Sequence, residues 1–150
     1  MHVSVADPSL DSPHGYYRGT AEFEQAVFKS GLSYSVLRPT VIFGGEDILI
    51  DNIASFVRRL SLFGVPGSGN SGIRPIYVED MARLIVDGVG KPGNEVVDAV
   101  GSETFTFDEL VRLIAAQIGQ PAWVVPLPAH WAYLSTPLAG LFLRDDIVPT

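Results

Sequence analysis

The chain has 150 residues, of which 47% are hydrophobic and 18% are charged, so it can bury a core and fits one domain over residues 1–150. Its formal net charge of −7 disfavours nucleic acid as a partner, because phosphate backbones repel such a surface. The chain contains no cysteine, which excludes disulfides and thiolate metal sites, and its three scattered histidines do not suggest a metal site.

The hydropathy of the chain suggests neither a signal peptide nor a membrane span. The amino terminus lacks the basic start and long apolar run of a signal peptide. The charge-free residues 117–143 are interrupted by four prolines and do not form an uninterrupted apolar span. We therefore expect a cytoplasmic protein without a membrane span.

Strands and helices are expected to alternate along the first half of the chain. A strand over residues 2–6 precedes a loop rich in Pro, Ser, Asp and Gly, and then a helix over 16–29 that ends at Ser30-Gly31. A strand over 34–43 is followed by a helix over 48–63, in which the apolar residues recur at helical spacing. We expect a flexible loop over 64–72 and an extended segment over 73–78.

The second half continues the same alternation. Glu79 and Asp80 place negative charge at the start of a helix that runs to about residue 89, where it suits the helix dipole. A strand over 95–100 precedes the capping-box spacing of Thr106 and Glu109 and a helix to residue 118. A short strand over 123–127 and a bent apolar helix over 131–143 follow. This order is typical of α/β layers around a largely parallel sheet.

Residues 67–72, GSGNSG, spell G-x-G-x-x-G, which is associated with dinucleotide binding when it follows a buried strand and opens a helix. Here a helix end is expected before it, and Pro75 disfavours helix at Arg74 after it. We interpret this segment as a mobile loop beside a cleft.

Four segments, taken in order, resemble a known superfamily: HVSVA (2–6), GYYRGTAEFEQAV (15–27), YSVLRPTVIFG (34–44) and RPIYVEDMARLIVDGV (74–89). They are similar to the later half of extended or atypical short-chain dehydrogenase/reductases. The similar branch is the NAD(P)-binding, epimerase-like one that includes NmrA-like proteins and accessory-subunit relatives of respiratory complex I. The resemblance implies the later half of a Rossmann-like, mostly parallel three-layer sheet with a small C-terminal α/β substrate-side region. It also implies a fragment or shortened relative that lacks the N-terminal dinucleotide-binding half.

The resemblance assigns roles to individual residues. Ser4 would help to hold the substrate, and Tyr16 matches the tyrosine of Y-x-x-x-K, which exchanges a proton with the reacting hydroxyl. The implied cofactor contacts, made through backbone groups near the nicotinamide, are Pro39, Thr40 and Val41. Arg74 would face the substrate. Each assignment has a plainer alternative: a strand hydroxyl for Ser4, a surface loop for Arg74 and simple helix packing for Tyr16.

Thr20 departs from the pattern, because the superfamily places lysine there. A positive charge about 4 Å from a tyrosine hydroxyl contributes roughly 4 kcal/mol at an effective dielectric of about 20, which equals about 3 pK units. Threonine has no charge to contribute. Lys29 lies roughly 20 Å farther along the helix, and Arg18 points to another face.

The sequence therefore predicts an oxidoreductase- or epimerase-like protein with NAD or NADP as cofactor and a small molecule as substrate. We expect weak or no cofactor binding and no activity in this chain alone. A non-catalytic nucleotide-sensing or assembly subunit is the first alternative. A self-associating fragment without a ligand is the second, because a half-sheet exposes a strand edge over residues 2–6 and invites a homo-oligomer.

Overall fold

The protein consists of two compact α/β units. The computed structural model describes residues 1–127 except 46, 71 and 92, so the helix expected over 131–143 lies outside the described residues. The first unit contains Met1–Asp47 and Ile73–Thr104, and the second contains Ile48–Gly72 and Phe105–Thr150. Each unit has its own buried core.

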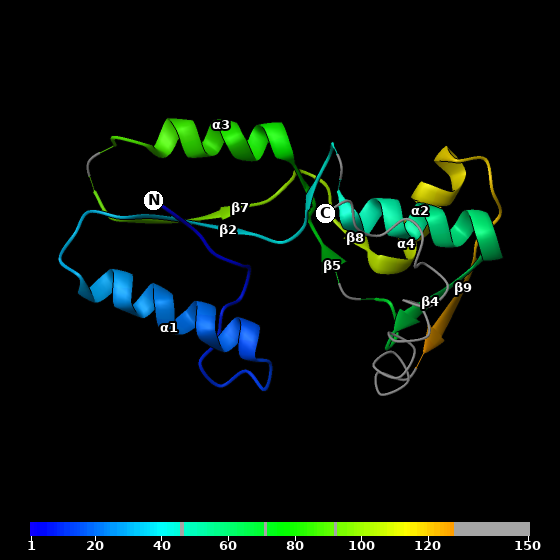
Figure 1. The fold of residues 1–150 in the computed structure, drawn as a ribbon, viewed down its shortest axis with the longest axis horizontal. Coiled ribbons are helices and arrows are strands. Elements are labelled where there is room, and N and C mark those ends of the chain that lie inside the picture. The colour runs from blue at the N-terminus through cyan, green and yellow to red at the C-terminus, as the bar shows by residue number, and fades with distance from the viewer. Residues whose placement is uncertain (46, 71, 92, 128–150) are drawn as a thin grey trace, which may run out of the picture. The chain divides into compact units, whose positions relative to one another are not determined.

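The first unit has a parallel sheet between two helices. Its three sheet strands, in spatial order, are β1 (His2–Val3), β2 (Ser35–Pro39) and β7 (Glu95–Ala99). Both pairings are parallel. Helices α1 (Gly15–Lys29) and α3 (Val78–Gly88) lie on opposite faces of this sheet, as Figure 1 shows. This arrangement confirms the α/β class and the predicted parallel layers.

The core of the first unit lies between the sheet and α3. Leu37, Ile76, Met81 and Ala99 are buried together, and Ile85 packs against them. Met81 and Ile85 are four residues apart, so α3 presents one apolar stripe to the sheet. Ile76 belongs to β6 (Ile76–Tyr77), which pairs in parallel with β3 (Ile42–Phe43).

The second unit has a different two-layer core. Strand β4 (Leu62–Pro66) pairs in parallel with β9 (Trp123–Leu127). Helix α2 (Ile48–Leu60) packs against α4 (Phe107–Gln117), and strand β8 (Phe105–Thr106) leads into α4. The predicted capping box is present: Glu109 N–H donates to Thr106 Oγ1 at 3.2 Å, and Thr106 N–H donates to Glu109 Oε2 at 2.7 Å.

Two sequence predictions were wrong in this unit. The helix expected to reach residue 63 ends at Leu60, and β4 occupies part of the segment interpreted as a flexible loop. Ser61 has a φ of 51°, which breaks the helix at that point. Gly64 then allows close approach of the paired strand, because a Cβ there would lie 2.4 Å from Leu127 Cδ1.

Candidate functional site

A depression in the first unit brings together the three residues assigned to catalysis. Ser4, Tyr16 and Thr20 line one open hollow of about 430 Å³, together with His2, Val3, Gly15, Gly19 and Phe23. The arrangement follows from topology, because the chain leaves β1 through a loop and returns as α1 beside the same strand. In parallel α/β sheets, ligands bind outside the carboxyl ends of the strands, which is where α1 begins.

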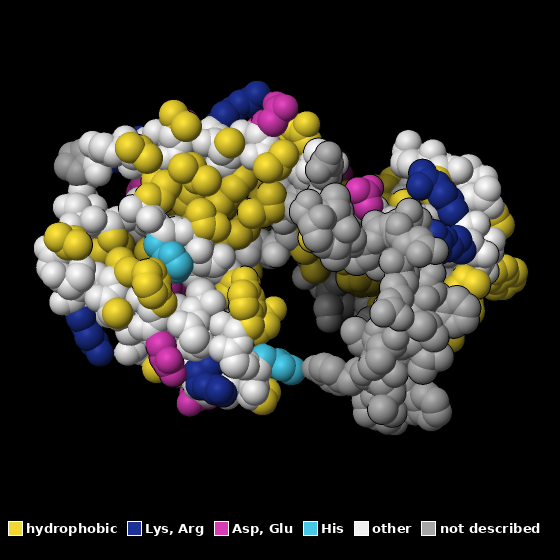
Figure 2. All heavy atoms as spheres, viewed as in Figure 1, with side chains coloured by type: hydrophobic (Ala, Val, Ile, Leu, Met, Phe, Trp, Pro, Cys, Tyr) yellow, Lys and Arg dark blue, Asp and Glu magenta, His cyan; other side chains and the backbone are white. Residues whose placement is uncertain are grey.

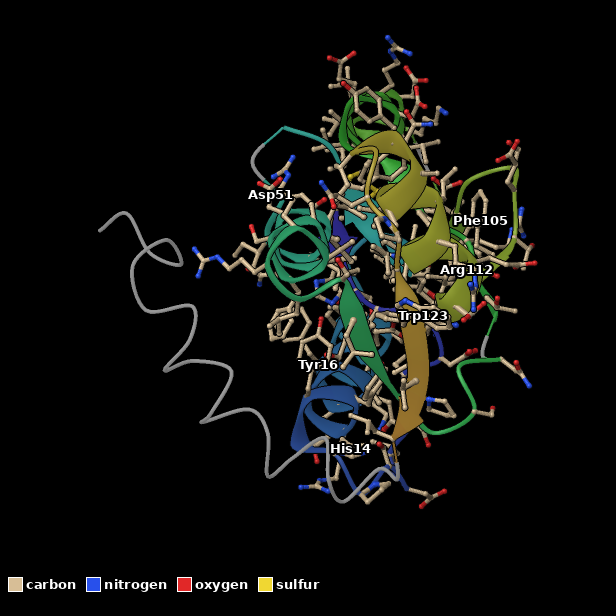
Figure 3. All side chains as sticks on the ribbon, turned by 90° about the vertical axis from the view of Figure 1, so that its right-hand side faces the viewer. His14, Tyr16, Asp51, Phe105, Arg112 and Trp123 are labelled. Atoms are coloured by element: carbon tan, nitrogen blue, oxygen red, sulfur yellow. The ribbon has the colours of Figure 1, made fainter. Side chains whose placement is uncertain are left out.

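Tyr16 stands on the first turn of α1 (Figure 3). It is 67% exposed, and its ring meets that of Tyr17 edge-on with centroids 5.5 Å apart. Thr20 does not interact with the phenol: its Oγ1 donates to the main-chain carbonyl of Tyr16 at 2.9 Å. No lysine or arginine is among the described residues that line the hollow. The tyrosine therefore has no cationic neighbour there.

A buried ion-pair network beside the hollow was missed by the sequence analysis. Glu24, on α1, is 2% exposed and accepts hydrogen bonds from Arg38 Nε at 3.0 Å and Arg38 Nη2 at 2.5 Å. The buried Ser4 hydroxyl donates to Glu24 Oε1. The network thus joins the residue that follows β1 to α1 and β2 through three side chains.

Glu24 and Arg38 shift each other's pKa. The Arg38 guanidinium holds the pKa of Glu24 below its ordinary value of 4.5, although burial acts in the opposite direction. Glu24 in turn raises the pKa of Arg38. Because Arg38 is already paired, its charge is largely neutralised and cannot replace the missing lysine at position 20. The sequence signal for this pair was the arginine itself. An arginine inside an otherwise apolar strand, here SVLRP, usually needs a buried partner.

The expected cofactor residues lie together, but internal bonds occupy several of their polar groups. Thr40 Oγ1 donates to the Arg74 carbonyl at 2.6 Å, and the Val41 carbonyl accepts from Ile76 N–H at 2.8 Å. The Pro39 carbonyl accepts from Ala6 N–H at 2.8 Å. These polar groups therefore take part in hydrogen bonds within the chain.

Arg74 is exposed, and its side chain is held by the main chain. Its Nε donates to the Gly101 carbonyl at 3.1 Å, and its own carbonyl accepts from Gly101 N–H at 3.4 Å. Gly101 permits this close approach, because a Cβ there would lie 2.0 Å from the Pro75 carbonyl oxygen. The geometry fits the structural loop role for Arg74 that was the alternative to substrate contact.

The G-x-G-x-x-G segment has the wrong surroundings for a dinucleotide. A strand, β4, does precede it, so the expected helix end was wrong, but it leads into strand β5 (Gly72–Ile73) and opens no helix. It borders a hollow of about 360 Å³ that is also lined by Asp108 and Glu109. Glu109 would repel a pyrophosphate, whereas Arg112, whose Nε lies 2.7 Å from Asp108 Oδ2, offsets the charge of Asp108. The residues present therefore do not fit the phosphates of NAD or NADP.

Over residues 1–127, apart from the three undescribed positions, no group of three or more His, Asp or Glu residues could hold a metal ion. None of the helices in that part is both long and apolar enough to cross a membrane.

Comparison with known proteins identifies relatives but no family model that matches the chain. The chain is 33% identical over 146 residues to the mitochondrial NADH dehydrogenase (ubiquinone) 1 alpha subcomplex subunit 9 of Dictyostelium discoideum, covering 96% of this chain and 38% of that protein. The Arabidopsis thaliana subunit of the same name is 28% identical over 131 residues, covering 85% and 33%. UDP-glucose 4-epimerase of Vibrio cholerae is 29% identical over 125 residues, covering 79% and 36%. The chain thus spans about a third of the length of these relatives.

Solved structures show the same fold at lower identity. The dTDP-4-dehydrorhamnose reductase of Bacillus anthracis, in complex with NADP, matches with a TM-score of 0.69 at 14% identity. The match covers 87% of this chain and 51% of the reductase chain. UDP-glucose 4-epimerase of Thermotoga maritima, with UDP-glucose, has a TM-score of 0.63 at 21% identity and covers 84% and 49%. These likenesses confirm the Rossmann-like half-sheet predicted from the sequence.

The relatives also correct one expectation. We expected a cytoplasmic protein, but three matching curated relatives are named as mitochondrial subunits. The cytoplasmic interpretation is therefore wrong. It rested on missing sequence signals, and such an absence does not identify a compartment.

Proposed function

We propose a function for this chain from its established relationship, since it corresponds to the later half of an extended or atypical short-chain dehydrogenase/reductase. It is an NAD(P)-associated, oxidoreductase- or epimerase-like protein that does not turn over a substrate by itself. The substrate is a small hydroxylated molecule that reaches Tyr16. The convergence of Ser4, Tyr16 and Thr20 on one hollow carries this proposal.

The proposed inactivity of the isolated chain has two physical causes. Thr20 leaves the phenol of Tyr16 without a cation, because threonine has no charge. Its hydroxyl is bonded to the helix backbone. The described residues also lack a fitting site for the cofactor phosphates, because the glycine-rich loop leads into a strand beside two carboxylates. Substrate positioning is therefore the part of the reaction that these residues can perform.

A non-catalytic assembly or nucleotide-sensing subunit is the second candidate. Several relatives are named as subunits of NADH dehydrogenase, and the position of the superfamily lysine holds Thr20 here. In this case the Glu24–Arg38 network stabilises the fold, and the hollow at Tyr16 is not used for chemistry.

Restoring the lysine distinguishes these two candidates. When this chain is combined with a nucleotide-binding half, Thr20→Lys should move the ionisation of one tyrosine to lower pH, and Tyr16→Phe should remove that signal. Turnover of NAD(P)H with hydroxylated or keto sugars should then increase by about tenfold or more, since general acid–base catalysis contributes about 10²–10⁴. Identical phenolate absorbance curves for wild type and Thr20→Lys would favour the assembly subunit.

A further inference from the structure

The hydroxyl hydrogen of Ser4 is used inside the protein. Ser4 Oγ is hydrogen-bonded to Glu24 Oε1. The Arg38 guanidinium donates to both oxygens of Glu24 and holds the pKa of this carboxyl below its ordinary value, so Glu24 is ionised at neutral pH. An ionised carboxylate has no hydrogen to give, so Ser4 is the donor in this bond. The Ser4 oxygen therefore has only lone pairs left for another partner.

The hydroxyl hydrogen of Thr20 is used in the same way. Thr20 Oγ1 lies 2.9 Å from the main-chain carbonyl oxygen of Tyr16, and a carbonyl oxygen can only accept. A bond to the carbonyl four residues earlier is a usual arrangement for a threonine within a helix. Ser4 and Thr20 line the same hollow, which thus contains two hydroxyl groups that act as acceptors.

Hydrogen-bond donors are scarce on this side of the hollow. The exposed Tyr16 phenol can donate or accept, whereas His2 packs on Phe23 with ring centroids 4.6 Å apart and has a buried Nε2. The free main-chain N–H groups of the first turn of α1 point along the helix axis toward its N-terminus. Figure 2 shows hydrophobic side chains and a histidine between α1 and the sheet, with Lys and Arg side chains beyond α1 and α3. Ser4 and Thr20 therefore attract groups that carry a hydrogen.

These two acceptors distinguish ligands by the hydrogens that the ligands carry. A ketone oxygen has lone pairs and no hydrogen, so beside Ser4 or Thr20 it makes no hydrogen bond and separates the acceptor from water. An alcohol donates its hydrogen to one of these oxygens and can still accept from Tyr16. The difference is one hydrogen bond, which corresponds to about two- to tenfold in affinity.

We propose that Ser4 and Thr20 make this hollow selective for alcohols over the corresponding ketones, because both hydroxyl hydrogens are held inside the protein. This inference rests on the proposed function and narrows its substrate class to the hydroxyl form of the substrate. The hydrogen of the ligand hydroxyl points to Ser4 Oγ or Thr20 Oγ1, and its oxygen accepts from the Tyr16 phenol. Glu24 acts here as a positioning residue, since it fixes the direction of the Ser4 hydroxyl.

Cyclohexanol and cyclohexanone are suitable probes, because they share one ring and differ at a single carbon. Each is titrated into the isotope-labelled 150-residue chain, and heteronuclear NMR follows the main-chain amides of Gly19 and Thr20. Cyclohexanol should bind more tightly than cyclohexanone, with dissociation constants that differ by about two- to tenfold.

Variants of the two acceptors test the cause of this preference. Thr20→Val keeps the shape of the side chain and removes one acceptor, so the ratio of the two dissociation constants should fall. Thr20→Ser is the matched control, because it keeps the hydroxyl and should keep the ratio. The double variant Ser4→Ala/Thr20→Val should bind both probes equally. A merely structural role of these residues would weaken both probes alike and leave the ratio unchanged.

The outcomes separate this inference from the proposed function. If the double variant proves unfolded by circular dichroism, Thr20→Val decides, and its ratio should be lower than that of Thr20→Ser. Equal or tighter binding of cyclohexanone by wild type, or an unchanged ratio in the variants, would overturn the inference alone. If neither probe shifted the α1 amides up to about 100 mM, both the inference and the proposed use of this hollow for a substrate would be overturned.

Discussion

The loss of stability on breaking the Glu24–Arg38 ion pair should depend on which partner is replaced. The Glu24 side chain is 3% exposed, whereas that of Arg38 is 28% exposed. Arg38→Met would leave a buried carboxylate without its cation, so we expect a loss of about 3–5 kcal/mol in the free energy of unfolding. Glu24→Gln leaves a guanidinium that can reach water, and the expected loss is about 1–3 kcal/mol. Urea denaturation measures both values.

The exposed pair in the second unit is the control for this comparison. Arg112 Nε donates to Asp108 Oδ2 at 2.7 Å, but the two side chains are 57% and 35% exposed. Arg112→Met should therefore leave the free energy of unfolding close to that of wild type, because water screens an exposed ion pair. Equal losses for Arg38→Met and Glu24→Gln would contradict the claim that burial of the carboxylate determines the cost.

The lowered pKa of Glu24 also predicts a pH dependence of stability. The folded pKa lies below the ordinary value of 4.5, so the unfolded chain binds the proton more readily. The stabilisation is complete above about pH 5 and is lost as the pH falls through the folded pKa. Unfolding free energies at several pH values between about 6 and 3 should decrease more steeply in wild type than in Glu24→Gln. Parallel curves would show that the network does not couple to the proton.

At this scale, a helical pattern and a motif resemblance supplied the candidate residues, whose catalytic roles stay predictions. The spacing of Tyr16 and Thr20 placed both on one helix face, and Ser4 followed from the resemblance. Glu24 and Arg38 could not be paired in the same way, because they lie 14 positions apart on a helix and a strand. Only the packing of α1 on the sheet brings them together.

Among the elements, α4 offers the clearest local prediction. Its capping box was readable because both partners lie within four residues, Thr106 to Glu109. Hydrogen bonds from Thr106 lower the pKa of Glu109. Thr106→Ala should destabilise the protein by about 1 kcal/mol, through loss of the Oγ1 acceptor for the Glu109 N–H.

Thr104→Ala is the matched control for the cap, since Thr104 is exposed and lies before the helix. Its thermal midpoint should stay close to that of wild type. Scanning calorimetry of the three proteins measures the difference, and a Thr104→Ala midpoint as low as that of Thr106→Ala would contradict a capping effect.

Strand β4 shows the limit of local patterns at the same scale. Its residues Leu62 to Pro66 continue the apolar run of α2 and include a glycine and a proline, which favoured the helix-end and loop interpretation. The strand is fixed by β9, which pairs with it from Trp123 onward. Such a distant pairing has no signal in a window of a dozen residues.

At the scale of the whole molecule, cofactor binding by the described residues depends on whether the glycine-rich segment can hold the pyrophosphate. NAD(P)H requires a strand–turn–helix for its pyrophosphate, and the Gly67–Gly72 segment leads from β4 into β5 instead. We therefore expect fluorescence titration of the 150-residue chain with NADH or NADPH to show no saturation up to about 1 mM, which corresponds to a binding free energy weaker than about −4 kcal/mol.

Two glycine variants decide whether the loop takes part in any binding that is seen. Gly69 and Gly67 both have positive φ, 71° and 69°, but only Gly69 has neighbours within 4 Å of an added Cβ, among them Val65 and Asp108. Both alanine variants carry a similar backbone strain of about 1 kcal/mol. Gly69→Ala also places its Cβ 3.1 Å from Val65 Cγ1, so it should lose more stability than Gly67→Ala. If NADH bound with micromolar affinity to wild type and Gly67→Ala, but not to Gly69→Ala, the loop would be a cofactor site. Titrations without saturation for all three proteins would agree with the expected lack of a phosphate site in this loop.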